Sequence, residues 1–303
     1  MFVIKYHKFF YIFTLILFAV SLASVLFFGL KLGLDFTGGS LLEVEYLNER
    51  PDIPELEERF LLLGYSGAKF QPASEKGLIV RLRDLTEEEH GIVMRALAEG
   101  GEPPQVLTEK RFDSVGPTIG SELKRNSLIA ILLVISLILI FISWTFRKVS
   151  RPVSSWKYGL VAIIALAHDI FIPTGLFAFL GWFAGAEIDS LFVTALLTIL
   201  GFSVHDTIVV FDRIRENLRK AAGNENFEDV VGRSLDETMG RSLATSFAIF
   251  LVLAALFWFG ASITRYFALT LLVGVIAGTY SSIFLASPLI VSWQKWISRN
   301  SDK

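Results

Sequence analysis

The sequence contains no cysteine among its 303 residues. Neither disulfide bonds nor thiolate metal sites can therefore contribute to its fold or its chemistry. This absence does not identify a compartment, because an oxidising environment permits disulfides without requiring them. The chain also lacks the HExxH pattern of zinc peptidases and the GxSxG pattern of serine hydrolases. These absences argue against an enzyme.

Apolar residues, in contrast, make up 53% of the chain and include 27 phenylalanines, a composition typical of membrane proteins. Charged residues cluster between apolar runs, and six of these runs approach the ~20 residues that a helix needs to cross a bilayer. The first run exceeds the roughly 7–15 apolar residues of a signal peptide, so we expect a retained anchor. The predicted spans cover residues 9–29, 123–146, 159–181, 190–211, 242–260 and 266–290.

Lys and Arg lie mainly in two of the connecting loops, which predicts that these loops face the cytoplasm. Both termini, 1–8 and 291–303, are then cytoplasmic, and the large polar segment 30–122 lies outside. The loops on the other side carry almost no basic residue, with Arg265 as the exception. The basic residues behind this orientation are Arg147, Lys148, Arg151 and Lys157 in loop 147–158, and Arg213, Arg215, Arg219, Lys220, Arg233 and Arg241 in segment 212–241.

Segment 30–122 is predicted to form a small α+β domain with the order βαββαβ, a ferredoxin-like pattern. Thr86 followed three residues later by Glu89 indicates a capping box at the start of the second helix. The segment carries 18 acids and 10 bases, a net charge of −8. We expect a solvated acidic surface, and binding of basic partners is the alternative. The predicted strands are 41–47, 68–73, 77–83 and 104–115, and the predicted helices are 54–64 and 87–100.

Two glycine-containing strings flank this domain. GLDFTGGS at 33–40 has neither a Lys-Ser/Thr pair nor a GxGxxG pattern after it, so it does not indicate nucleotide binding. We expect Gly38 and Gly39 to permit a tight turn where the domain leaves the first span. SVGPTIG at 114–120 is expected to form the corresponding turn where the chain returns to the membrane.

Two of the predicted spans contain a His-Asp pair, His168-Asp169 in the third and His205-Asp206 in the fourth. An ionisable residue inside a span is a functional candidate by default, because its burial is costly. The third and fourth spans are antiparallel and joined by a short turn, so we expect Asp169 and Asp206 to lie within one turn of each other in depth. Arg241, which opens the fifth span, is the nearest cation to neutralise Asp206. A buried carboxylate whose desolvation is offset by an arginine can bind and release a proton, and His205 could titrate in the same range.

Other interpretations of these polar residues remain open. Asp206 and Arg241 could form a static pair that fixes helix packing, and Asp169 could cap a broken backbone near Pro173. The two His-Asp pairs could form a metal pathway, but nothing else supports it and we predict no metal site. Segment 212–217 is either an interfacial anchor or a lever that joins the fourth span to loop 218–240.

The last span contains Gly274, Gly278 and Ser282 at four-residue spacing. Such a stripe of small residues predicts close contact with a neighbouring helix. We interpret it as a packing feature.

Five strings in order resemble the SecF family, the smaller subunit of the bacterial SecD–SecF protein-export complex. They are LDFTGG at 34–39, SVGPTIG at 114–120, AHD at 167–169, DTIVVFDRIREN at 206–217 and RSLATS at 241–246. The resemblance implies a polytopic helical membrane protein of the bacterial cytoplasmic membrane, half of an RND-type transporter. It also implies a SecD-like partner in a heterodimer, the SecYEG channel, an unfolded preprotein in transit, no nucleic acid, no cofactor, and the proton gradient as the energy source.

By the same resemblance, Asp206 and Arg241 match the carboxylate and the arginine of the proposed proton path. The family commonly has Asn at the position of His205 and Tyr at that of Phe202. His205 could therefore alter the proton path, or it could hydrogen-bond as Asn does. Two rival functions are a stand-alone proton-driven exporter of lipid or drug and a structural assembly factor. The assembly factor predicts that Asp206 can be neutralised without loss.

Overall fold

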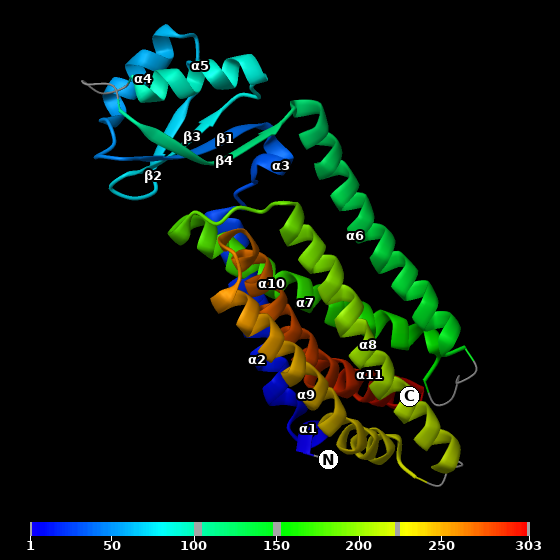
Figure 1. Cartoon of the computed structure of the whole chain (residues 1–303). Helices are drawn as coiled ribbons and strands as arrows, with labels where there is room; N and C mark the ends of the chain where they lie inside the picture. Colours follow the sequence, from blue (N-terminus) through cyan, green and yellow to red (C-terminus); the bar gives the residue numbers. More distant parts are fainter. Residues whose placement is uncertain (1, 100–104, 148–152, 222–224, 302–303) are drawn as a thin grey trace. The chain divides into compact units, whose positions relative to one another are not determined.

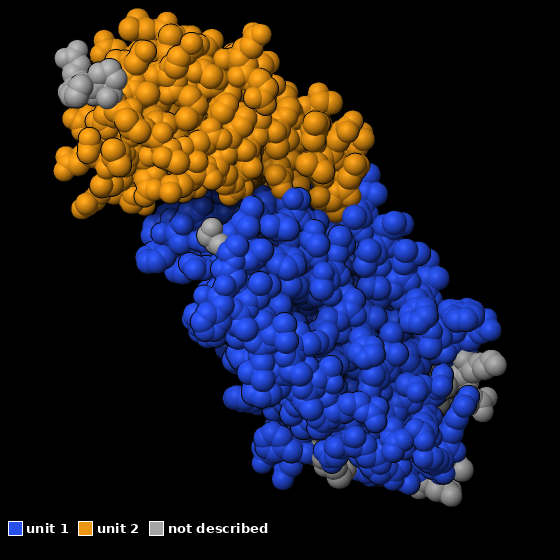
Figure 2. All heavy atoms as spheres, in the orientation of Figure 1, with its two compact units in different colours: residues 1–31, 128–303 blue, residues 32–127 orange. Residues whose placement is uncertain are grey.

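The computed structural model describes residues 2–99, 105–147, 153–221 and 225–301 (Figure 1). Lys148, Arg151 and the predicted strand start at Pro104 lie outside these ranges. The chain divides into two compact units, which Figure 2 shows in different colours: a helical unit of residues 1–31 and 128–303, and a unit of residues 32–127. Each unit is described by itself.

Within the described ranges, six helices are long and apolar enough to cross a membrane. The chain is therefore a multi-pass membrane protein, as its composition predicts. A short helix, α1, precedes them at Phe2–Lys5. The six are α2 (His7–Phe28), α6 (Pro117–Thr145), α7 (Ser155–Ala184), α8 (Ser190–Ala221), α9 (Phe227–Phe259) and a last helix made of α10 (Ser262–Tyr280), the π-helical segment η1 (Ser281–Ala286) and α11 (Ser287–Ser301).

Several helices extend beyond the predicted spans. α8 continues to Ala221 and α9 already begins at Phe227, so most of segment 212–241 is helical. α6 begins at Pro117, six residues before the expected start of its span. Proline is well suited to the first position of a helix, because its fixed φ matches the helix and its missing N–H has no partner there anyway.

Close helix packing in this unit depends on small residues. A Cβ added to Gly274 would lie 2.1 Å from Cδ1 of Ile199, and one on Gly278 would lie 3.0 Å from Cβ of Ser203. Both contacts join α10 to α8, so the small-residue stripe is a packing surface, as predicted. On α7, Gly175 is equally close to Ser21 of α2, and Ser24 Oγ donates a hydrogen bond of 2.7 Å to the Gly175 carbonyl.

Residues 32–127 form a four-stranded antiparallel sheet with the strand order β2-β3-β1-β4. The chain order is βαββαβ, and the predicted ferredoxin-like pattern is confirmed. α4 and α5 pack on the sheet through a buried apolar core that includes Leu42, Val44, Leu56, Phe60 and Leu97. The elements are β1 (Gly39–Tyr46), α4 (Ile53–Leu62), β2 (Lys69–Pro72), β3 (Gly77–Leu82), α5 (Glu87–Ala98) and β4 (Leu107–Val115), preceded by a short helix α3 (Leu34–Thr37).

The predicted capping box is present at the start of α5. The Glu89 N–H donates to Thr86 Oγ1 at 3.3 Å, and the Thr86 N–H donates to Glu89 Oε2 at 2.9 Å. The two exchanged bonds satisfy backbone donors that a helix N-terminus otherwise leaves unpaired.

The two glycine-containing strings meet in space. Gly38 and Gly39 have φ values of 71° and 112°, in the region that favours glycine. A Cβ on Gly39 would lie 2.6 Å from the Leu82 carbonyl oxygen, and a Cβ on Gly120 would lie 3.0 Å from the Gly38 nitrogen. The tight turn predicted for LDFTGG is therefore present, and SVGPTIG packs directly against it.

Candidate functional site

The core of the helical unit contains buried polar side chains contributed by α7, α8, α9 and the last helix. Burying polar groups is unfavourable unless they find partners, so their positions mark a constrained region. The set comprises His168, Asp169, Ser203, Asp206, Thr207, Ser246, Thr279, Ser281 and Ser282.

Asp169 is fully buried and has three hydrogen-bond partners. Ser203 Oγ of α8 and Ser281 Oγ of η1 donate to its Oδ2 at 2.5 and 2.8 Å. His168 Nδ1 lies 3.0 Å from Oδ1. The idea that Asp169 caps a broken backbone near Pro173 is wrong, because α7 continues without interruption through this proline and the carboxylate bonds to other helices instead.

The π-helical segment η1 positions two of the hydroxyl groups. Pro288 follows it and lacks the N–H that an α-helix would direct to Phe284, and a proline ring also crowds the carbonyl four residues before it. The wider helix is seen in the bond from Ser287 Oγ to the Ser282 carbonyl, five residues back, at 3.0 Å. In this segment Ser281 reaches Asp169, and Ser282 Oγ lies 2.8 Å from Thr207 Oγ1 of α8.

Asp206 lies on α8, three residues after Ser203, and is 3% exposed. Its side chain shares a hydrogen bond with Ser246 of α9. Thr279 Oγ1 of α10 is 2.6 Å from Ser246 Oγ, so a short hydroxyl chain leads from the last helix to the carboxylate. The second oxygen of the carboxylate, Oδ2, is buried and has no hydrogen-bond partner among the described residues.

The other two candidates for the proton path, Arg241 and His205, are exposed and not buried beside the Asp206 carboxylate. Arg241 is exposed and, in the part of the chain that is described, forms no ion pair with Asp206. It lines a cavity of about 380 Å³ beside Arg213 and Glu237. His205 adjoins Asp206 in sequence but its side chain is exposed, on a different face of α8.

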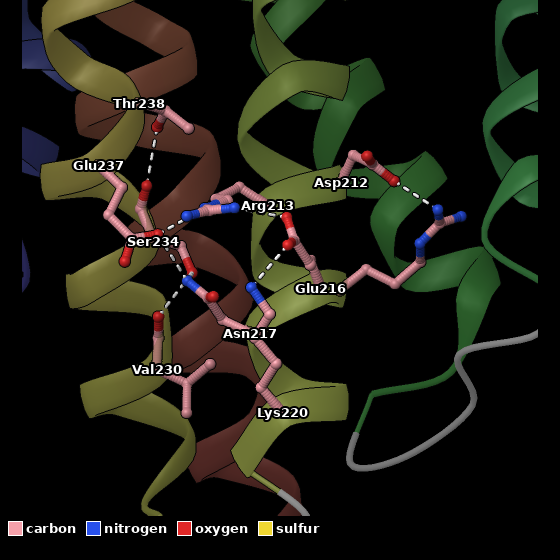
Figure 3. Close-up of polar contacts among 10 residues, drawn as sticks. Asp212, Arg213, Glu216, Asn217, Lys220, Val230, Ser234, Glu237 and Thr238 are labelled. Atoms are coloured by element: carbon pink, nitrogen blue, oxygen red, sulfur yellow. Dashed lines mark hydrogen bonds and ion pairs between the residues drawn. The ribbon is translucent and has the colours of Figure 1, made fainter.

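A charged network joins the extension of α8 to that of α9 (Figure 3). Arg213 binds Glu216 on its own helix and Glu237 on α9, both at 2.5 Å. Asn217, only 3% exposed, donates to Ser234 Oγ at 3.0 Å and to Glu237 Oε2 at 2.9 Å. Segment 212–217, expected to be an anchor or a lever, is therefore helical and is bonded to the first turns of α9.

The metal-pathway interpretation gains no support. Among the described residues, no three His, Cys, Asp or Glu side chains are grouped so that they could hold a metal ion. His168-Asp169 faces Ser203 and Ser281, whereas the side chain of His205 is exposed.

Several of the site residues were not predicted individually from the sequence, among them Ser203, Thr279 and Ser281. Ser203 carried a usable signal, because it lies three residues before Asp206 and so shares its helix face. Ser281 had a weaker one, as half of a serine pair in an apolar run. Thr279 could be recognised only from the packing of α10 against α9.

Comparison with known proteins places this geometry in a family. A family model described as "Protein export membrane protein SecD/SecF, C-terminal" matches residues 101–296, and one described as "SecD/SecF GG Motif" matches residues 23–46. The protein translocase subunit SecF of Thermobaculum terrenum is 40% identical, over 96% of this chain and 93% of that protein. SecF of Synechocystis is 39% identical, over 88% of this chain and 84% of that protein.

The solved structures agree. The crystal structure of SecDF, a translocon-associated membrane protein from Thermus thermophilus, matches 96% of this chain with a TM-score of 0.77 and 32% identity. This chain covers only 38% of that protein, so it corresponds to one part of SecDF. The similarity extends over nearly the whole chain, and the chain belongs to the SecF family of protein translocase subunits in the Sec export machinery.

Proposed function

We propose that this chain couples the movement of protons through the membrane to the export of unfolded preproteins, together with a SecD-like partner and the SecYEG channel. Under this proposal, it lies in the bacterial cytoplasmic membrane with both termini in the cytoplasm and residues 30–122 outside. The proton gradient supplies the energy, and neither a cofactor nor a metal is needed.

The observation that carries the proposal is the environment of Asp206. Its carboxylate is buried in a predicted span, the Ser246 hydroxyl is a hydrogen-bond partner, and Oδ2 has no partner among the described residues and can accept a proton. An ionised carboxylate in such a place is costly, so functional roles such as proton relays account for most carboxylates found within spans. An ion pair with Arg241 would instead indicate that Asp206 fixes helix packing. That pair is not formed among the described residues.

The energy available from protons suits a mechanical role. One elementary charge that crosses a potential of 100 mV releases about 2.3 kcal/mol, and each unit of pH difference adds about 1.36 kcal/mol. A few protons could thus drive a rigid-body movement of residues 32–127. α2 and α6 flank this unit in the chain, so they are the connections through which the movement would pass.

The proposal of a SecD-like partner rests on the relatives. SecDF of Thermus thermophilus is 34% identical over 93% of this chain, which covers 37% of that protein. Its name shows SecD and SecF joined in one chain. The exposed apolar side chains of α6 and α9, such as Leu132, Phe141, Phe247 and Val252, offer surface for a second helical bundle or for lipid.

The test is export of a preprotein into inverted membrane vesicles, with and without a proton gradient, at equal abundance of the complex. We expect Asp206→Asn to reduce export to the level seen without a gradient. The matched control is Asp229→Asn, the same chemical change at an exposed position of α9, which should keep the gradient response. If Asp206→Asn retained full gradient-dependent export, Asp206 would be a packing residue and the assembly-factor function would be favoured.

A further inference from the structure

We propose that His168 and Asp169 form a second proton-binding site in the helical unit. His168 Nε2 is the atom that takes up the proton, and Asp169 orients the ring and balances its charge. The role of this site in export rests on the proton-coupled function proposed above, whereas its chemistry can be tested independently.

The first argument is the hydrogen bonding of Asp169. Two serine hydroxyls and one imidazole nitrogen surround its two oxygens at 2.5, 2.8 and 3.0 Å. Hydrogen bonds donated to a carboxylate stabilise its charged form. The ionised form of Asp169 therefore has three hydrogen-bond partners, although the residue is fully buried.

The second argument is the state of His168 that this anion selects. An ionised carboxylate can only accept hydrogen bonds, so the proton of the neutral imidazole is on Nδ1. The lone pair is then on Nε2. This nitrogen is buried, belongs to a side chain that is 3% exposed, and has no hydrogen-bond partner in the described part of the chain. It is an open proton acceptor inside the bundle.

The third argument is the charge of the pair. A neutral His168 beside an ionised Asp169 carries one net negative charge in a buried place. When a proton binds to Nε2, the imidazolium and the carboxylate form a neutral pair, and the proton leaves from the same atom. An uncompensated buried charge is more costly than a buried pair, and the protonated form of the site carries no net charge.

The groups around His168 and Asp169 are hydroxyls and one further carboxylate, so none of them supplies a positive charge to the pair. No Lys or Arg is among the buried residues that the structure describes. The last helix presents the Tyr280 ring, 6.1 Å from the imidazole between centroids, but its hydroxyl is engaged by Thr14 and by the Phe10 carbonyl. From α2, Tyr11 is bonded to Ser292. α8 contributes Asp206, and α9 and α10 contribute the hydroxyls of Ser246 and Thr279.

Protonation of His168 would change the hydrogen bonds that Asp169 makes with two other helices. Asp169 is bonded to Ser203 on α8 and to Ser281 at the start of η1. When the imidazolium forms, it draws the carboxylate charge toward Oδ1, and both serine bonds to Oδ2 weaken. Short π-helical segments are frequent at functional sites, so η1 is the element that we expect to rearrange. Ser203 would carry the change one helical turn to Asp206.

The experiment is ¹⁵N NMR of the full chain, labelled at histidine and reconstituted with its SecD-like partner in lipid nanodiscs. The chain has four histidines, so His168→Gln identifies the signal of His168 by its loss. His7→Gln serves as the matched control, because His7 bonds only the nearby Ile4 carbonyl and its removal should leave the His168 signal unchanged.

We expect the neutral form of His168 to carry its proton on Nδ1 and to gain a second proton on Nε2 as the pH is lowered. Asp169→Asn should move the midpoint of this titration to lower pH by about one unit or more, because it removes the balancing charge. Ser281→Ala keeps the charge and should move the midpoint upward. A proton on Nε2 in the neutral form, or a wild-type signal that gains no second proton on Nε2 as the pH is lowered, would overturn the inference.

The two proposals fail separately. If Asp206→Asn keeps gradient-dependent export while His168 titrates as described, the proton-coupled function falls and the binding site stands. If His168 does not titrate while Asp206→Asn abolishes the gradient response, the binding site falls and the function stands.

Discussion

Ser203 on α8 donates a 2.5 Å hydrogen bond to Asp169 on α7. Ser203 also lies three residues before Asp206, a rise of about 4.5 Å along the helix. The two carboxylates buried in the spans are therefore at nearly the same depth and are linked through one turn of α8. Each is also connected to the last helix, Asp169 through Ser281 and Asp206 through Ser246 and Thr279. The last helix is thus linked to both carboxylates, directly to Asp169 and through Ser246 to Asp206.

The contact between α8 and α9 at their charged ends should depend on Asn217. Asn217→Ala removes the amide that donates to Ser234 and Glu237, and we expect a loss of about 1–2 kcal/mol of local stability. Hydrogen exchange of residues 212–221 in nanodiscs measures this as roughly tenfold faster exchange. Lys220→Gln is the control, because its exposed ion pair with Glu216 contributes little to stability. Equal exchange in both variants would show that the network does not hold the helices together.

The turn at Gly39 should not tolerate a side chain. In Gly39→Ala, the added carbon would lie 2.6 Å from the Leu82 carbonyl oxygen at a φ of 112°. Strained backbone of this kind costs about 1–3 kcal/mol, so residues 32–127 of the full chain should become more sensitive to protease. Gly91→Ala is the matched control: Gly91 lies in α5 with no other atom within 4 Å of the added carbon, and the change should stabilise that helix by up to about 1 kcal/mol. Unchanged protease resistance in Gly39→Ala would contradict the steric argument.

The ferredoxin-like unit should lose stability in acid through Glu89. The Arg83 side chain, together with the backbone and hydroxyl of Thr86, lowers the pKa of Glu89 from 4.5 to about 2. Because the folded value is the lower one, this contribution is complete above pH 4.5 and is lost as the pH falls toward 2. Glu89→Gln should therefore be less stable than the wild type at pH 7, and the difference should shrink as the pH falls through this window.

Unfolding of residues 32–127 within the full chain, followed by hydrogen exchange at several pH values, measures the difference. Glu88→Gln is the control, since Glu88 is exposed and lies outside the capping box. A difference between Glu89→Gln and the wild type that stays constant down to pH 2 would rule out the ionised Glu89 as its source.

Much of the fold could be predicted because its signals are local. Apolar runs identify the spans, the Thr86–Glu89 spacing identifies a helix start, and alternating strands identify the sheet. The helix ends were harder to predict, as α8 and α9 show. Residues 212–221 are polar but good helix formers, so they continue a helix that begins in an apolar segment. Hydropathy registers where an apolar run ends, and a helix can extend past that point.

The candidate site could be predicted only in part, for a physical reason. Asp169 and Asp206 are conspicuous because charge is rare in apolar runs. Their partners are serines and threonines, which occur throughout these helices and often bond only their own backbone, as Thr198 does to the Thr194 carbonyl. Which hydroxyls face a carboxylate depends on the rotation of each helix and on the π-helical segment. Those features arise from tertiary packing.

The close approach of α10 to α8 at Gly274 should be sensitive to a single methyl group. A Cβ at this position would lie 2.1 and 2.3 Å from two carbons of Ile199. We expect Gly274→Ala to destabilise the helical unit by about 1–3 kcal/mol through overpacking. Ile199→Ala alone should cost about 2–5 kcal/mol through the cavity that it leaves.

Gly274→Ala and Ile199→Ala should compensate each other. The smaller side chain at position 199 leaves space, and the methyl group added at position 274 fills part of it. Thermal unfolding of the reconstituted chain should show that the double variant is more stable than the sum of the single effects predicts. Gly201→Ala on α8 is the control, since no atom lies within 4 Å of its added carbon, and it should not interact with Ile199→Ala. If the effects of Gly274→Ala and Ile199→Ala were simply additive, α10 and α8 would have room to separate, and the small-residue stripe would not set the distance between the helices that carry Ser203 and Ser281.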